Sequence, residues 1–232
     1  ASGSLPSDFV LERGAYCMIM PANFECRIVP YETTAYKAKR EWSALSPSSI
    51  KPLRPNIAAF PKTKGFAFEV EEGAHIAAIY TEHVGKSGLT VNGTTPDKSL
   101  PHHPCDFCFE GVDVSALCHT GSNTVALDAV RDMVYLEGDF MLDGAILRAP
   151  RELGLGDLAQ ARMPHYWGGV EYVFEFDGVR DLLRVDLTGG AAEIFINASS
   201  AGVIFGEPAT LRIRDFCSDG HNKLSVRVYS TA

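Results

Sequence analysis

Two carboxyl side chains, Glu137 and Asp139, have a spacing that could serve glycosidic hydrolysis. Residues two apart on a β-strand point to the same side, and both lie in a predicted strand. A glycosidase needs two carboxyl groups facing each other across a sugar, roughly 5 to 10 Å apart. Perturbed carboxylates also occur in structural networks. We favour a turn or ion-pair role and predict no catalytic residue in this chain.

Histidine and cysteine gather between residues 102 and 119. The chain reads His102-His103-Pro104-Cys105-Asp106-Phe107-Cys108, and Cys118-His119 follows. Cys-x-x-Cys is a zinc-ligand spacing, but all the candidates fall in one short stretch, whereas structural sites combine separate ligand pairs. A metal site and a disulfide stay open as alternatives. Buried or loop thiols are the favoured interpretation, and we predict no metal and no cofactor.

Several phosphate and hydrolase motifs are incomplete. Gly85-Lys86-Ser87 resembles the end of a Walker loop, but Tyr80 stands where that motif needs glycine. The run 154–159 fits the permissive dinucleotide pattern without a strand and helix to frame it. Neither Gly-x-Ser-x-Gly nor His-Glu-x-x-His occurs. These nucleotide, hydrolase and metalloprotease classes therefore lose their usual support.

Sugar recognition would use aromatic faces stacked on C–H surfaces, with polar side chains bonding hydroxyl groups. His165, Tyr166 and Trp167 form the best such cluster. Glu82 and His83 precede a predicted hairpin and could line a pocket at a loop end. The competing interpretation is that Tyr166 and Trp167 pack in a core, and that Glu82 and His83 are one polar strand end. We retain all five as candidate carbohydrate-binding residues.

These residues must be positioned by strands, because apolar side chains alternate with polar ones over short stretches. Ten-residue amphipathic segments are scarce, and Gly, Asn, Asp and Pro separate the runs, which favours antiparallel sheets. We therefore predict a β-sandwich. The alternating positions include 66, 68 and 70; 172, 174 and 176; 183, 185 and 187; 194 and 196; and 224, 226 and 228.

The same order of signals occurs twice along the chain, which indicates an internal repeat. Asn92-Gly93 and Gly121-Ser122-Asn123 in the first half correspond to Asn197-Ala198 and Gly220-His221-Asn222 in the second. Asn-Gly favours the positive φ angles of a tight hairpin. Because Ala198 replaces the glycine, we expect a looser turn, or another type, at that position. Both hairpins also contain N-glycosylation sequons, which could be accidental.

Composition and charge restrict the function classes. Of 232 residues, 46% are hydrophobic and 22% charged, which is typical of a folded globular protein and excludes disorder. The net charge of −8 disfavours nucleic acid as a partner. The longest apolar run, residues 15–20, is far shorter than the ~20 residues of a membrane span. We expect neither nucleic-acid binding nor a membrane span. The opening Ala-Ser-Gly-Ser is typical of a trimmed fragment.

The chain of motifs resembles a known family. Residues from about 64 to 230 resemble the galactose-binding-like jelly rolls that are attached to large bacterial glycoside hydrolases of the family 2 and rhamnosidase-like type. The matching segments are 89–93, 112–115, 121–125, 134–140 and 164–172. Residues 1–63 match nothing in the family.

The resemblance implies two tandem galactose-binding-like jelly-roll β-sandwiches. The first would occupy residues 1–147, with an unplaced N-terminal segment, and the second residues 148–232. Glu137 and Asp139 would then lie at a module junction without a catalytic role. The implied function is a non-catalytic accessory fragment of a glycoside hydrolase. Its partners would be carbohydrate, held weakly, and the parent's catalytic domain; an extracellular or periplasmic location is favoured.

The sequence leaves two further function classes open. One is an independent lectin-like or adhesion module, and the other is a glycosidase in its own right. The first predicts sugar binding by the isolated fragment, and the second predicts turnover of aryl glycosides.

Overall fold

The computed structural model describes residues 25–30, 42–103, 107–155, 158, 160–187 and 189–229. In this part of the chain every regular element is a β-strand, apart from two short 3-10 turns, η1 and η2, so the all-β prediction is confirmed. The strands are β1 (Glu25–Pro30), β2 (Ser43–Ala44), β3 (Ser49–Pro52), β4 (Asn56–Val70), β5 (His75–Glu82), β6 (Thr90–Val91), β7 (Ser99–Leu100), β8 (Phe109–Asp113), β9 (Gly121–Asp139), β10 (Met141–Asp143), β11 (Ile146–Arg148), β12 (Val170–Asp177), β13 (Arg180–Asp186), β14 (Ala191–Ile196), β15 (Ser199–Phe205), β16 (Ala209–Arg212) and β17 (His221–Tyr229). The turns are η1 (Val84–Lys86) and η2 (Arg214–Phe216).

Eight strands form one curled sheet in the order β10-β11-β4-β9-β5-β8-β7, with β6 also paired to β9. The long strands β4 and β9 pair along most of their length, with an irregularity between Thr63 and Gly65. One half of β9 pairs with β6 and the other half with β5. The sheet therefore folds over on itself and encloses a hydrophobic core, which includes Phe68, Ile79 and Leu136.

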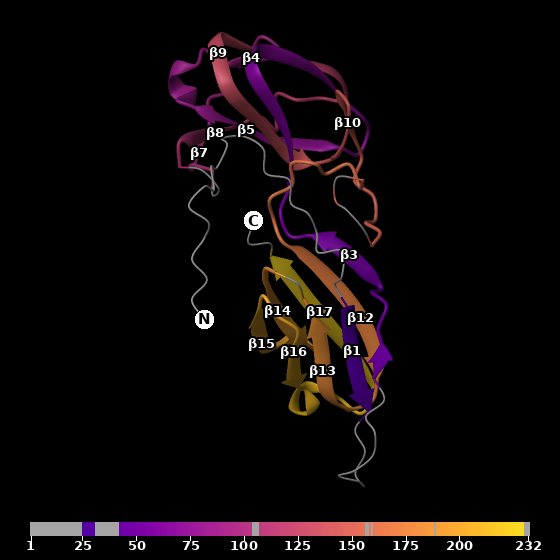
Figure 1. Ribbon diagram of the computed structural model, residues 1–232. Coiled ribbons are helices and arrows are strands. Elements are labelled where there is room, and N and C mark those ends of the chain that lie inside the picture. Colours follow the sequence, from indigo (N-terminus) through magenta and orange to yellow (C-terminus); the bar gives the residue numbers. More distant parts are fainter. Residues whose placement is uncertain are drawn as a thin grey trace.

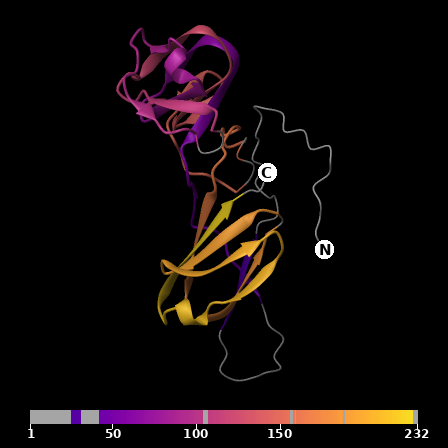
Figure 2. The same cartoon turned by 90° about the vertical axis from the view of Figure 1, so that its left-hand side faces the viewer.

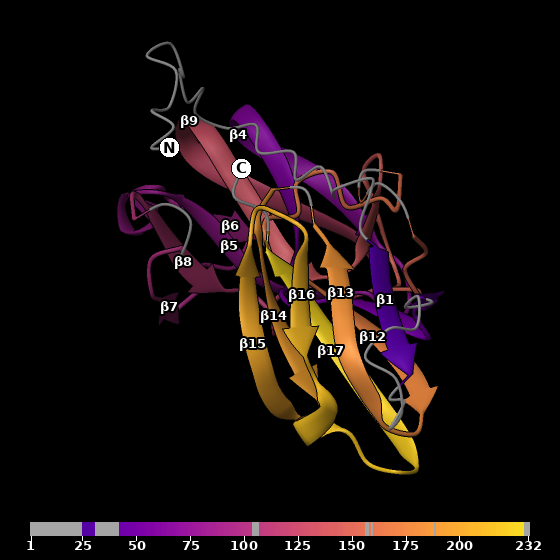
Figure 3. The ribbon, with the colours of Figure 1, turned by 60° about the horizontal axis from the view of Figure 1, so that its bottom comes forward.

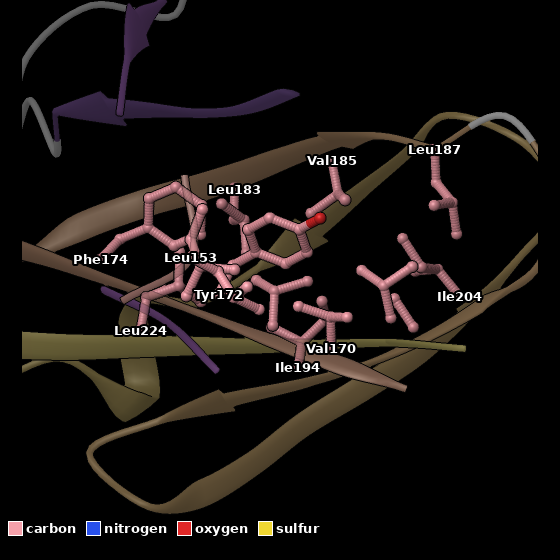
Figure 4. Close-up of a cluster of buried hydrophobic side chains, with 14 of the residues drawn as sticks. Leu153, Val170, Tyr172, Phe174, Leu183, Val185, Leu187, Ile194, Ile204 and Leu224 are labelled. Atoms are coloured by element: carbon pink, nitrogen blue, oxygen red, sulfur yellow. The ribbon is translucent and has the colours of Figure 1, made fainter. Parts of the chain in front are cut away.

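The remaining strands form two facing sheets, β16-β13-β1-β2 and β15-β14-β17-β12-β3. Both sheets contribute to one hydrophobic core. Figure 4 shows part of it, with Tyr172 and Phe174 of β12 among Leu183 of β13 and Leu224 of β17. The alternating positions of β12, β13, β14 and β17 point into this core, as the sequence predicts. This part of the chain is a β-sandwich (Figure 3).

The early strands β1 and β3 belong to the sandwich of the late strands. β1 pairs with β13 along its length, and β3 pairs with β12 in the register Ile50 to Tyr172. In the sequence, the eight strands of the curled sheet therefore stand between the early strands of the sandwich, β1 to β3, and its late strands, β12 to β17. Figures 1 and 2 show the result as two bodies lying end to end. No local pattern in residues 1–63 predicts this pairing.

The predicted internal repeat appears first as an asparagine pair in the curled sheet. The Asn92 side-chain amide donates to Asn123 Oδ1 and to the carbonyl oxygen of Leu117, both at 2.9 Å. The backbone N–H of Thr124 donates to Asn92 Oδ1 at 2.9 Å. This arrangement fastens the hairpin after β6 to the start of β9.

The same arrangement recurs in the β-sandwich. The Asn197 amide donates to Asn222 Oδ1 at 2.9 Å and to the carbonyl oxygen of Phe216 at 3.1 Å. The backbone N–H of Lys223 donates to Asn197 Oδ1 at 3.0 Å. Each bond has its counterpart in the first pair, so the repeat that spacing predicts extends to individual hydrogen bonds.

The expected difference between the two hairpins is wrong. Asn92 and Gly93 have φ angles of 51° and 79°, and Asn197 and Ala198 have φ angles of 50° and 67°. Positive φ at both central residues is the signature of the type I′ turn. Ala198 thus adopts the left-handed conformation in spite of its Cβ, because the asparagine pair and the strand pairing on both sides of the turn fix the loop.

Candidate functional site

The described residues bring together a group of side chains where the curled sheet meets the sandwich. Two chain segments run there: the connection from β3 to β4, and the connection from β11 to β12. Tyr166, on the second connection, is completely buried. Its hydroxyl accepts hydrogen bonds from the backbone N–H groups of Leu53 and Arg54 at 2.9 and 3.0 Å, and donates to the carbonyl of Gly169 at 2.6 Å. Tyr166 therefore ties the two connections together.

Tyr166 is buried, and the residues around it are closely packed. Burial raises the pKa of the Tyr166 hydroxyl, so it stays protonated and able to donate. A Cβ at Gly168 would lie 2.4 Å from that hydroxyl oxygen, and one at Gly169 would lie 2.6 Å from the ring of Tyr229. No larger residue fits at either position without movement. The Gly-Gly pair after Trp167 therefore serves packing.

Trp167 faces the curled sheet and is half-buried. The guanidinium carbon of Arg54 lies 4.3 Å from the centroid of its ring, and the His103 ring meets it edge-on with centroids 5.0 Å apart. The indole N–H is buried and has no hydrogen-bond acceptor among the described residues. A buried donor without an acceptor costs about 1–3 kcal/mol. Such a donor marks a place where an acceptor from a ligand would be stabilised.

The curled sheet contributes Tyr80, His103 and Glu137 to the same group. The Tyr80 and His103 ring centroids are 4.8 Å apart, and His103 Nε2 lies 3.7 Å from Glu137 Oε2. Burial, and then the negative charge of Glu137, raise the pKa of Tyr80. The Tyr80 ring lies over Gly111, where a Cβ would be 2.5 Å from the ring. We call Arg54, Tyr80, His103, Glu137 and Trp167 the junction cluster.

A cavity of about 80 Å³ lies beside the junction cluster. Its charged and polar lining groups are Arg54, Asn56, Asp139 and Arg151, and we call it the junction cavity. The other lining residues are Pro52, Gly138, Phe140, Met141, Pro150, Leu153 and Met163. Ligand pockets usually measure about 300–1,000 Å³, so this cavity can enclose only one end of a sugar-sized molecule.

The five predicted site residues are only partly brought together. Trp167 is in the junction cluster, whereas Tyr166 beside it is buried and its hydroxyl is occupied. His165 is half-buried, and burial lowers its pKa, which favours a neutral ring. Glu82 shares a face of β5 with Tyr80, since side chains two apart on a strand point the same way. His83 is exposed and begins η1 with a left-handed φ of 52°.

The two carboxylates considered for catalysis have different surroundings. Glu137 lies beside His103, and Asp139 lines the junction cavity, to which Glu137 does not contribute. The two therefore do not share that space.

The His- and Cys-containing stretch is only partly described, because Pro104, Cys105 and Asp106 lie outside the described residues. Within the described part of the chain, no group of three or more metal-ligating side chains is found. Burial raises the pKa of Cys118 to about 11 and also raises that of Cys217, so both thiols are protonated at neutral pH. Among the described residues, no helix has the length and apolar character of a membrane span.

Sequence reasoning missed most of the junction cluster. Arg54 lies in a segment that matches no family motif, Tyr80 was considered only in a failed phosphate motif, and His103 only as a zinc ligand. Because these residues come from separate strands and connections, local spacing does not predict that they lie close together in the structure. The strand predicted around Glu137 and Asp139 gives Glu137 a place on a sheet face, but no local pattern predicts that it lies beside His103.

Comparison with known proteins finds partial structural similarity to bacterial rhamnosidases. No family model matches the chain, and no curated protein matches it. The α-L-rhamnosidase of Streptomyces avermitilis, solved with L-rhamnose, is similar with a TM-score of 0.33 and 14% identity over 78% of this chain and 22% of that one. The rhamnosidase of Novosphingobium sp. PP1Y gives 0.29 and 13% over 76% and 21%. The chain thus spans about a fifth of the length of these structures.

Proposed function

We propose that this chain is a non-catalytic accessory region of a glycoside hydrolase that holds carbohydrate weakly at the junction cluster. Its other partner would be the parent protein's catalytic domain. We further propose that it consists of two galactose-binding-like jelly rolls, and the duplicated asparagine pairs support that arrangement. Since β1 and β3 pair with late strands, we assign β1 and β3 to the second module together with the late strands β12 to β17.

The observation that carries the sugar-binding proposal is the buried indole N–H of Trp167, which has no acceptor among the described residues. Sugar sites combine an aromatic ring with polar groups that fix hydroxyl positions. The guanidinium of Arg54, a donor, lies over the Trp167 ring, and the carboxylate of Glu137, an acceptor, lies 3.7 Å from His103, whose ring contacts Trp167. A sugar can accept from the indole through one hydroxyl and donate to the carboxylate through another.

Weak affinity follows from the position of Arg54. Its side chain is exposed and covers the face of Trp167 on which a sugar would stack. Moving an exposed cation from an aromatic face costs about 0.5–1 kcal/mol. This cost weakens binding by about two- to fivefold.

Tryptophan fluorescence tests this proposal, because the chain has two tryptophans, Trp42 and Trp167. In a Trp42→Phe variant, Trp167 is the sole reporter. Titration with L-rhamnose, D-galactose and their oligosaccharides is expected to give a saturable change. Glu137→Gln should weaken binding several-fold, whereas Glu207→Gln, on an exposed turn, should leave it unchanged.

Three results would overturn the proposal. Fluorescence that stays flat across the sugar panel removes carbohydrate binding at the junction cluster. Turnover of aryl glycosides by the wild type, abolished by Glu137→Gln or Asp139→Asn, would make the chain a glycosidase. Turnover that survives both substitutions would exclude these two carboxylates from the mechanism, and would equally contradict a non-catalytic role.

A further inference from the structure

The junction cavity is lined by three charged residues, of which only Arg54 also belongs to the junction cluster. Arg54 and Arg151, which carry guanidinium groups, line it, and so does Asp139, which carries a carboxylate. None of the three forms an ion pair within the described part of the chain, where the Arg54 side chain contacts the Trp167 ring. Elsewhere at the junction, arginines are paired: Arg148 and Arg162 both reach Asp143, at 2.6 and 2.7 Å. The cavity therefore has an excess of unneutralised positive charge.

A buried amide adds a hydrogen-bond donor to the same cavity. Asn56 is only 2% exposed, and its amide donates one N–H to the carbonyl of Phe140 at 2.9 Å. Its Oδ1 accepts from the backbone N–H of Ile57 at 2.8 Å. A side-chain amide has two N–H groups, and the second has no acceptor among the described residues. This donor fixes a preferred position for an acceptor oxygen.

The size of the cavity limits what can enter. Its volume of about 80 Å³ is several times the roughly 10–15 Å³ that a cavity needs to hold one water, and is far below that of a sugar pocket. A carboxylate group fits, together with a water. Guanidinium groups bind carboxylates through paired charge-assisted hydrogen bonds, which makes arginine the preferred partner for such planar oxyanions.

We propose that the junction cavity binds a carboxylate through Arg54, Arg151 and the Asn56 amide, and that in the carbohydrate role the ligand is an acidic sugar. The acidic-sugar part rests on the proposed function, whereas the carboxylate part does not. Asp139 can accept a hydrogen bond, so it suits a hydroxyl next to the carboxylate. The ring of a hexuronate then lies outside the cavity, and Arg54 links the cavity to Trp167, which it contacts.

Methionine methyl groups provide a local readout, since Met141 and Met163 line the cavity and Met133 packs against a different cluster. We would titrate ¹³C-methyl-methionine protein with sodium acetate, D-galacturonate and neutral D-galactose at constant ionic strength. Acetate and galacturonate are expected to shift the Met141 and Met163 signals and leave Met133 in place. Galactose is expected to leave all three in place.

The arginines are tested by matched variants. Arg151→Gln removes one charge from an exposed side chain and should weaken both anions about tenfold, the scale of one charge-assisted hydrogen bond. Arg212→Gln, on exposed β16 outside the cavity, should change nothing. Unfolding curves for both variants should match the wild type.

The outcomes separate the two proposals. Unshifted Met141 and Met163 signals with both anions, or equal affinity in Arg151→Gln and wild type, overturn the cavity proposal. Acetate binding without tighter galacturonate binding overturns the acidic-sugar assignment and supports a free-anion site. Anion shifts at the two methionines with no Trp167 response to any sugar support the cavity and overturn the proposed function alone.

Discussion

At the scale of single residues, the most constrained side chain of the junction is Tyr166. One hydroxyl group satisfies two backbone donors and one backbone acceptor that come from connections more than a hundred residues apart. Unpaired buried backbone groups are costly. Tyr166 thus substitutes for the regular strand pairing that neither connection has at this point.

Replacement of Tyr166 by Phe is expected to destabilise the protein by about 1–3 kcal/mol, because three backbone groups lose their partner. Urea unfolding followed by circular dichroism measures the change. Tyr229→Phe is the matched control, since the Tyr229 hydroxyl donates to Glu193 on the exposed face of the sandwich; its cost should be under about 0.5 kcal/mol. Equal costs for the two variants would contradict the role given to Tyr166.

The asparagines of the two sequons are also committed to structure. The amides of Asn92 and Asn197 each donate to two acceptors, so both N–H groups are used. A glycan on Nδ2 would remove one donor. We predict that folded protein secreted from a eukaryotic host has both asparagines unmodified, which intact-mass measurement before and after glycosidase treatment can check. A glycan on correctly folded protein would refute this.

At the scale of elements, the two hairpins show what sequence can and cannot predict. Turn chemistry is local, so spacing alone identifies Asn92, Asn123, Asn197 and Asn222 as equivalent positions, and their hydrogen bonds agree. The conformation of Ala198 is different: its intrinsic preference opposes a positive φ, and only the pairing of β14 with β15 and the Asn222 contact impose it. Propensity arguments fail where tertiary contacts decide.

Reciprocal substitutions in the hairpins test that explanation. Ala198→Gly should stabilise the protein by about 0.5–1 kcal/mol, since glycine removes a left-handed strain of about 1–2 kcal/mol and adds a smaller cost in chain entropy. Gly93→Ala should destabilise it by a similar amount, because φ is 79° there and a Cβ would meet no neighbouring atom. Thermal unfolding of both variants measures the effects. A destabilising Ala198→Gly would contradict the assigned strain.

At the scale of the whole molecule, a charge network fastens the connection between the two bodies. Asp143, at the end of β10, accepts from Arg148 of the next strand and from Arg162 of the connection to β12. Arg148 also donates to Glu71 at 3.0 Å. The backbone N–H of Leu142 donates to the carbonyl of Arg162 at 2.8 Å, beside the same network. The charges thus reinforce a backbone contact between the hairpin and the connection.

This network predicts a pH-dependent stability. The hydrogen bond from Arg148, with the charge of Arg162, lowers the pKa of Asp143 from its ordinary 3.8. A carboxyl with a depressed folded-state pKa stabilises the fold above its unfolded pKa and loses this contribution as pH falls through the folded value. Wild type should therefore exceed Asp143→Asn in stability near neutral pH, and the difference should shrink below about pH 4.

Urea unfolding of both proteins across that pH range is the measurement. Salt at about 1 M should reduce the difference, because the network is partly exposed. Asp219→Asn, on the exposed turn before β17, should give no comparable pH-dependent difference. A gap between wild type and Asp143→Asn that stays constant down to pH 3 would contradict the assignment.

The arrangement of the sheets marks the limit of prediction from sequence. The alternation of apolar and polar residues predicts the strands of the sandwich, because a strand with one buried face shows this pattern in its local sequence. The pairing of Ser48 with Val173, at a separation of 125 residues, has no such pattern. The composition of the junction cluster depends on the same long-range pairing, so the sequence identifies Trp167 as a candidate but not the residues that surround it.

The pairing of β3 with β12 also sets an order of events during synthesis. The ribosome releases β3 first, then the whole curled sheet, and only afterwards the strand that β3 needs as its neighbour. The curled sheet can fold while β1 and β3 still lack the strands with which they pair. A nascent chain stalled before residue 170 would therefore present β3 as an unsatisfied edge, open to chaperones or to another growing chain.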